Sequence, residues 1–200
     1  MSQQSRSAET QALFLTAVGK HLSERGETAL KLAGICTEVG MSQTAIYYHF
    51  GSREAVIDAA YLQIYEELMN LELAMWRKAI AESDLNNICS HYVTQRITCP
   101  SAFSTGLPSK MHIQILSAST VRKGFKTQYD AANQKFLDAL TVLFQGAIDR
   151  GAISGNLSAR QIALLVECLL INQRDSQFQL APSSDWNKTV EEFFGLLSQS

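Results

Sequence analysis

The stretch ICTEVGMSQTAIYYHF, residues 35–50, decides how the region around it folds. Its apolar, small and polar residues are spaced as in two short helices that meet at a tight corner. Gly40 tolerates the left-handed conformation that a helix needs just past its last turn, so we expect the first helix to end at Val39. Ser42 is a good N-cap for the second helix, because its hydroxyl can accept hydrogen bonds from the N–H groups that open it. The pattern is typical of a helix-turn-helix unit.

The second of these helices is suited to the major groove of DNA. No carboxylate occurs from Ser42 to Ser52, so nothing on this segment repels phosphate. Side chains on a helix in the major groove can read the edges of base pairs. The side chains expected to project from it are those of Gln43, Thr44, Ala45, Tyr47, Tyr48 and His49.

Met41 and Ser42, followed by IYYHFGSREA at residues 46–55, resemble the signature of the TetR family of transcriptional regulators. Upstream, the resemblance extends to the family's first helix and the glycine that closes it, through Ala17, Val18, Leu22 and Gly26. Three positions depart from the family pattern: His21 replaces an apolar residue, Lys31 replaces Ser or Thr, and Arg53 replaces Lys. The third change keeps the positive charge.

The resemblance implies an all-α protein with two domains. Residues 1–51 would form the helix-turn-helix DNA-binding domain, and residues 52–200 a larger helical domain for effector binding and dimerisation. It also implies a regulator that binds a palindromic operator as a dimer and is released by a small-molecule effector. We expect a repressor, because most members of the family repress. Base edges would be reached by Gln43, Thr44, Ala45, Tyr48 and His49, and phosphates by Tyr47 and Arg53.

Composition and charge narrow the function further. With 200 residues and 46% hydrophobic content, the chain can bury a substantial core. Neither a long apolar run nor an apolar leader occurs, so we expect no membrane span and a cytoplasmic protein. Five Lys and Arg residues balance five Glu residues up to Glu54, so nonspecific attraction to DNA should be modest. Two copies acting together on a palindrome would compensate for that.

The rest of the chain is expected to be helical. Helices are predicted at residues 8–25, 30–39, 43–49, 52–84, 85–98, 110–119, 121–150 and 158–173 and from residue 184 on, with a loop at 99–109. We call the predicted helix-turn-helix domain the head and the rest of the chain the body. In the first helix, the residues expected to form the core of the head are Leu13, Phe14, Ala17, Val18 and Leu22. The fourth helix contains neither Pro nor Gly, so we expect it to connect the head stiffly to the body. The last two long helices are predicted to pair with a second copy; the alternative is that they complete the core of a monomer.

An effector pocket is expected in the body, among the fourth and later helices, because an apolar cavity with a few polar groups is the usual small-molecule site. The candidate lining residues are Tyr65, Tyr92, Arg96, Cys99, Phe103, Met111, His112 and Tyr129. Cys99 resembles a cysteine with which a subgroup of the TetR family senses electrophiles, although Thr98 stands where that subgroup has glycine. Electrophile sensing at Cys99 is therefore a hypothesis.

Other functions find less support in the sequence. The four cysteines have no metal-binding spacing and are expected to be reduced thiols, so no metal or other cofactor is predicted. No catalytic motif occurs, and we do not expect an enzyme. The competing interpretation is a helical dimeric interaction module that has lost DNA binding; a mobility shift with DNA would separate the two.

Overall fold

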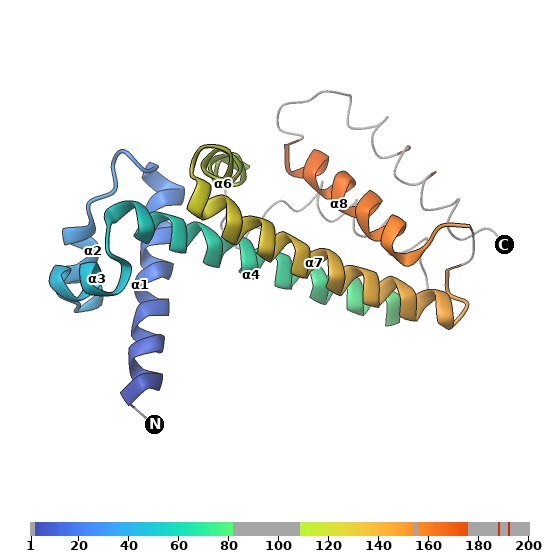
Figure 1. The fold of residues 1–200 in the computed structure, drawn as a ribbon, viewed down its shortest axis with the longest axis horizontal. Helices are drawn as coiled ribbons and strands as arrows, with labels where there is room; N and C mark the ends of the chain where they lie inside the picture. Colours follow the sequence, from blue (N-terminus) through green and yellow to red (C-terminus); the bar gives the residue numbers. More distant parts are fainter. Residues whose placement is uncertain (1–2, 82–108, 154–155, 176–187, 189–191, 193–200) are drawn as a thin grey trace. The chain divides into compact units, whose positions relative to one another are not determined.

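The computed structural model of the chain describes residues 3–81, 109–153, 156–175, 188 and 192. Within this part of the chain there are seven helices and no strand, which confirms the all-α prediction (Figure 1). The helices are α1 (Gln3–Arg25), α2 (Leu32–Val39), α3 (Gln43–Phe50), α4 (Arg53–Ala81), α6 (Ser109–Val121), α7 (Lys123–Asp149) and α8 (Ala159–Asp175). None of the described helices is long and apolar enough to cross a membrane.

The predicted helices agree with these bounds to within a few residues, except that α1 begins five residues earlier than its prediction at Ala8. The absence of Pro and Gly explains why α4 continues unbroken as far as it is described. The helix predicted at 85–98, the loop at 99–108 and nearly all of the last helix lie outside the described residues.

The chain divides into two compact units. Unit 1 comprises Met1–Glu67 and Lys110–Tyr129, and unit 2 comprises Leu68–Ser109 and Asp130–Ser200. Unit 1 therefore contains the segment predicted as the helix-turn-helix domain, together with the first part of α4, almost all of α6 and the start of α7. Helices α4 and α7 each contribute one part to each unit.

The core of unit 1 joins α1, α2 and α3. Phe14, Val18, Ile35 and Ile46 have no exposed surface, as their apolar spacing predicted. Leu13 is a correction: it is 62% exposed, because the buried stripe of α1 passes through its neighbour Phe14. Sequence spacing alone does not reveal how wide the buried stripe of a helix is.

Helix α4 packs closely on α1 at a glycine. A side chain at Gly19 would bring its Cβ to 2.9 Å from Cδ1 of Ile64, a separation too short for two carbon atoms. Further along α4, an aromatic cluster joins it to the start of α7. The ring centroids of Tyr65 and Tyr129 are 4.7 Å apart, and those of Tyr61 and Phe125 are 6.2 Å apart.

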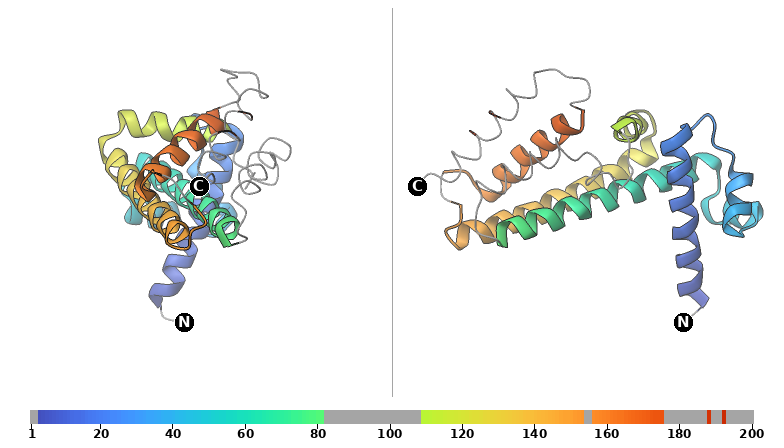
Figure 2. Two further views of the ribbon diagram at one scale, coloured as in Figure 1. Left: turned by 90° about the vertical axis from the view of Figure 1, so that its right-hand side faces the viewer. Right: turned by 180° about the vertical axis from the view of Figure 1, so that it is seen from behind.

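In unit 2, the later part of α4 runs beside α7, and α8 lies along α7 (Figures 1 and 2). The rings of Trp76 on α4 and Phe144 on α7 meet edge to face at 5.4 Å. Ser158 caps α8 by accepting from the N–H of Gln161 at 3.3 Å, while the Gln161 amide oxygen accepts from the N–H of Ser158. The buried stripe of α8 consists of Ala159, Ile162, Ala163 and Val166.

Candidate nucleic-acid interface

The corner between α2 and α3 has the geometry that its sequence predicted. Gly40 has φ 69° and ψ 28°, a left-handed conformation that is strained for any residue with a Cβ. The N–H of Met41 then donates to the carbonyl of Cys36 at 2.9 Å, which closes α2. Ser42 accepts from the N–H of Ala45 at 3.1 Å through its hydroxyl, so it caps α3. The left-handed Gly40 and the Ser42 cap thus fix the orientation of α3 against α2.

Helix α3 buries one side chain and exposes most of the others. Ile46 is completely buried, whereas Tyr48 is 86% exposed and Tyr47 is 42% exposed. Gln43, Thr44 and His49 are also exposed, and Ala45 is half-buried. The two neighbouring exposed tyrosines make this face of α3 a candidate contact surface.

His49 is linked to α1. Its Nδ1 lies 3.2 Å from Nε2 of Gln11, and the ring of Tyr48 meets that of His49 edge to face with centroids 5.6 Å apart. The amide of Gln11 can donate to Nδ1 in the tautomer of His49 that carries its ring proton on Nε2. In that tautomer the ring also has an N–H group at Nε2 that can donate.

Arg53, predicted as a phosphate contact, has partners inside the protein. Its Nη2 donates to the carbonyl oxygens of Glu27 and Leu30 in the connection between α1 and α2. This guanidinium therefore ties the start of α4 to that connection. Its contact with phosphate stays a prediction and would use the remaining N–H groups of the fork.

The two other departures from the family pattern have visible consequences. Lys31 stands at the N-cap of α2 without any side-chain hydrogen bond to the helix, and α2 starts at Leu32, two residues later than predicted. His21 on α1 lies 3.2 Å from the carboxylate of Glu38 on α2. A polar residue at this position is thus accommodated by a partner on the neighbouring helix.

Arg122, between α6 and α7, contacts three acidic residues of unit 1. Its Nη2 lies 2.8 Å from Oε2 of Glu27, its Nη1 2.6 Å from Oδ1 of Asp58, and its Nε 3.3 Å from Oε1 of Glu54. Arg122 and Asp58 are largely buried, with side chains 19% and 16% exposed. We call these four residues and Tyr61 the Arg122 cluster. It connects α6 and α7 to the α1–α2 connection and to α4.

Tyr61 completes the cluster by donating its hydroxyl to Oε1 of Glu27 at 2.9 Å. Burial and the neighbouring carboxylate of Glu27 raise the pKa of Tyr61 far above its usual value, so the phenol keeps its proton and remains a donor. Burial also raises the pKa of Asp58, against the opposing effect of Arg122.

Sequence reasoning missed Arg122 because its partners lie 64 to 95 positions away. No local pattern predicts such a pair. One feature of the sequence did relate to this cluster, the equal number of acidic and basic residues up to Glu54. Two of those acidic residues, Glu27 and Glu54, pair with Arg122, which lies outside that segment.

The predicted effector residues are only partly described. The rings of Tyr65 and Tyr129 contact each other at a tilt of 50°, and Met111 and His112 on α6 are buried, all within unit 1. Tyr92, Arg96, Cys99 and Phe103 lie outside the described residues. Of the cysteines with described side chains, Cys36 is buried, which raises the pKa of its thiol, and Cys168 is exposed. No group of three or more metal-ligating side chains occurs in the described part of the chain.

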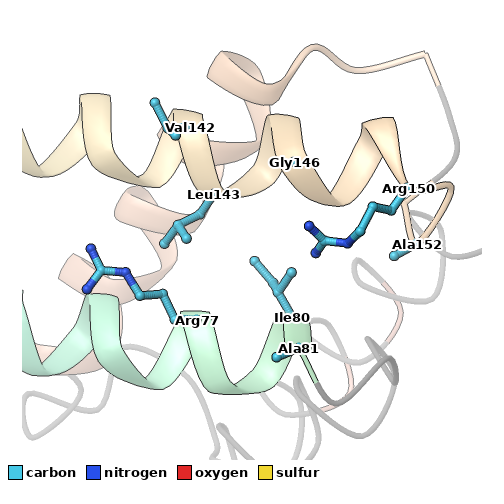
Figure 3. Close-up of a pocket in the computed structure, with 8 residues that line it drawn as sticks. All are labelled: Arg77, Ile80, Ala81, Val142, Leu143, Gly146, Arg150 and Ala152. Carbon is cyan, nitrogen blue, oxygen red and sulfur yellow. The ribbon is translucent and has the colours of Figure 1, made fainter.

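A groove in unit 2 includes none of the predicted effector residues that the structure describes. It has a volume of about 630 Å³, between the later parts of α4 and α7 (Figure 3). It is lined by Arg77, Ile80, Ala81, Val142, Leu143, Gly146, Arg150 and Ala152. The sequence did contain one signal for it, a glycine in the interior of α7, where glycine is unfavourable without a packing reason.

Comparisons with known proteins agree with this geometry. Residues 17–60 match the family model of bacterial regulatory proteins of the tetR family. A proposed TetR-family transcriptional regulator from Mesorhizobium loti MAFF303099 superposes with a TM-score of 0.73 over 94% of this chain and 96% of its own, at 16% identity. The reduced form of NemR from E. coli has a TM-score of 0.66 over 95% of this chain and 98% of its own, at 12% identity.

A third solved structure, a proposed transcriptional regulator from Saccharomonospora viridis in complex with choline, has a TM-score of 0.64. It covers 94% of this chain and 96% of its own at 16% identity. No curated protein has a significantly similar sequence. Identities this low show the fold, while the matched segment carries the helix-turn-helix described above. Residues 17–60 are thus similar to the tetR family of bacterial regulatory proteins, and the fold of the chain is similar to that of these solved structures.

Proposed function

We propose that the protein is a ligand-responsive transcriptional regulator that binds a palindromic operator as a homodimer, with α3 in the major groove. The observation that carries the proposal is the surface of α3, where Tyr47 and Tyr48 stand exposed on a segment without a carboxylate. The readers of base edges would be Gln43, Thr44, Ala45, Tyr48 and His49, with Tyr47 and Arg53 at the phosphates. Acting on DNA, the protein would work in the cytoplasm and need no catalytic residue.

A homodimer is supported by the charges and by α8. The head has little excess positive charge, so one copy gains little from the phosphates and two copies on one duplex gain more. On α8, Leu164 and Leu165 are 42% and 38% exposed beside the helix's own buried stripe. An apolar face of this kind suits pairing with the same face of a second copy.

Release by a small molecule is the remaining part of the proposal. A neighbour with the same fold was solved with choline bound, which supports a ligand-binding role for folds of this kind. We propose a repressor, in line with most of the family. The second candidate, an interaction module without DNA binding, is less favoured because the exposed face of α3 keeps its tyrosines and its capped geometry.

The test is selection of bound sequences from random duplex DNA by the purified protein. We expect the wild type to enrich a palindrome with half-sites about one helical turn, roughly 34–36 Å, apart. Gln43→Ala should relax the preference at one position in each half-site, at a cost of about 1–3 kcal/mol for the correct sequence. Tyr48→Ala should weaken binding to the selected site.

The matched control is Thr127→Ala, an exposed side chain on α7, which should leave the selection unchanged. If the wild type enriches no sequence even at low salt, the proposal is wrong and the interaction module becomes the better interpretation.

A further inference from the structure

The groove in unit 2 holds two cations that lack counter-charges in the described part of the chain. Arg77 comes from α4 and Arg150 directly follows α7, and neither guanidinium has a carboxylate partner there. The backbone of Arg150 is held in place, because the N–H groups of Gly151 and Ala152 donate to the carbonyls of Ile148 and Ala147, each at 2.9 Å. These bonds fix the backbone at the end of α7, and the exposed guanidinium of Arg150 is accessible to an anion from solvent.

The carboxylates on the same part of α7 are engaged elsewhere. Asp138 accepts from Nη1 of Arg160 at 3.0 Å, and Asp149 accepts from Nε2 of Gln145 at 2.8 Å. Among the described residues, no acidic side chain lines the groove. Within the described part of the chain, the positive charge of the groove is therefore not balanced by the residues that line it.

Between the two arginines the groove is apolar. Leu143 from α7 and Ile80 from α4 point toward each other, with the guanidinium groups of Arg77 and Arg150 on either side of them (Figure 3). At Gly146 an added Cβ would meet only Nη1 of Arg150, at 3.5 Å, so the missing side chain leaves the floor of the groove open. The volume, about 630 Å³, is in the range of small-molecule sites.

We propose that this groove binds an organic anion with an apolar body, whose carboxylate is held by Arg150 and Arg77 and whose hydrocarbon part lies on Ile80 and Leu143. Carboxylates pair with the planar guanidinium group through two parallel hydrogen bonds. An apolar body gains by leaving water for the leucine and isoleucine side chains. The inference rests on the proposed function only in making this anion the effector that the regulator senses.

The test is isothermal titration calorimetry of the full-length protein, without DNA, against octanoate and against uncharged octan-1-ol. We expect octanoate to bind and octan-1-ol to bind at least about tenfold more weakly, because it lacks the charge-assisted hydrogen bonds. Arg150→Met and Arg77→Met keep most of the side-chain bulk, and each should lower the affinity for octanoate by about tenfold. Gly146→Leu should abolish binding by filling the floor of the groove.

Two features keep the result interpretable. Gly146→Leu introduces a better helix former where only a flexible arginine end stands nearby, so it should leave the thermal midpoint unchanged or raised. Lys135→Met removes one exposed positive charge from α7 outside the groove and should leave octanoate binding unchanged.

Several outcomes would overturn the proposal. They are an absence of octanoate binding to the wild type, equal binding of octan-1-ol, or unchanged binding in Gly146→Leu or in either arginine variant. Octanoate would also fail to bind the wild type if a second copy of the chain covered the groove in solution.

DNA release is measured separately, with the duplex found by selection. Octanoate should release the wild type, but not Gly146→Leu, from that duplex. If octanoate binds in the groove and DNA affinity does not change, the anion is not the effector. If octanoate binds and no DNA is ever selected, the proposed function is wrong and the binding site stands.

Discussion

Arg122 neutralises acidic side chains that would otherwise face one another. Glu27, Glu54 and Asp58 come from two segments of unit 1 and converge on one guanidinium. Removing one partner of a buried ion pair costs more than the pair itself contributes, because the remaining charges are left without compensation. Here the uncompensated charges would be mainly those of Glu27 and Asp58, since Glu54 is 67% exposed and is screened by water.

We therefore expect Arg122→Met to lower the free energy of unfolding by about 2 kcal/mol, between the values typical of exposed and of fully buried pairs. The measurement is urea denaturation followed by circular dichroism. The matched control is Arg160→Met, which removes a more exposed pair with Asp138 and should cost below about 1 kcal/mol. Equal losses in the two variants would show that burial of the Arg122 cluster contributes nothing.

At the scale of elements, α2 contains one glycine and is followed by another, and the two have opposite roles. Gly34 lies inside the helix, exposed, with nothing within 4 Å of an added Cβ. Gly40 has the same open surroundings but a φ of 69°. The two positions thus separate the effect of backbone conformation from that of space.

Gly34→Ala should raise the free energy of unfolding by about 0.4–1 kcal/mol, because alanine restricts the unfolded chain and favours the helix. Gly40→Ala should lower it by about 1–2 kcal/mol, the cost of a left-handed conformation for a residue with a Cβ. Thermal denaturation of both variants beside the wild type measures the difference. A stabilising Gly40→Ala would contradict the role assigned to the corner between α2 and α3.

Sequence reasoning succeeded for features set by neighbouring residues. The cap at Ser42, the left-handed Gly40 and the buried Ile46 all depend on positions within a few residues of one another, so their pattern is visible in the chain. It failed where the outcome depends on distant segments. The exposure of Leu13 and the internal hydrogen bonds of Arg53 were decided by tertiary packing, which helical spacing does not encode. The phosphate contact of Arg53 stays a prediction.

The candidate sites divide in the same way. The exposed face of α3 could be predicted because a short helix with one buried residue leaves the others in solvent. The groove could not, because it needs residues of α4 and α7 separated by more than sixty positions. Only Gly146 indicated that one face of α7 stays open at that point.

At the scale of the whole molecule, assembly should depend on α8. Leu164→Glu places a charge on the apolar face predicted to meet a second copy, so it should convert a dimer into a monomer in sedimentation velocity. Affinity for a palindrome should fall by about a hundredfold or more, because the two heads then no longer bind as one unit.

Val121→Glu is the matched control, since Val121 is 74% exposed at the end of α6 and outside the proposed interface. It should remain a dimer with unchanged affinity. A dimeric Leu164→Glu protein would place the interface on another surface.

The Arg122 cluster also bears on whether the helix-turn-helix segment, residues 1–51, is modular. A chimera that joined residues 1–51 to the body of another regulator would keep Glu27 but lose the arginine that neutralises it. The recipient would have to supply a cation at the same junction, or the transplanted head would carry an unbalanced charge next to its own α1–α2 connection. The head can therefore be exchanged between proteins only together with its ion pair to Arg122. A graft that keeps this ion pair must include residues 110–129 as well as residues 1–51.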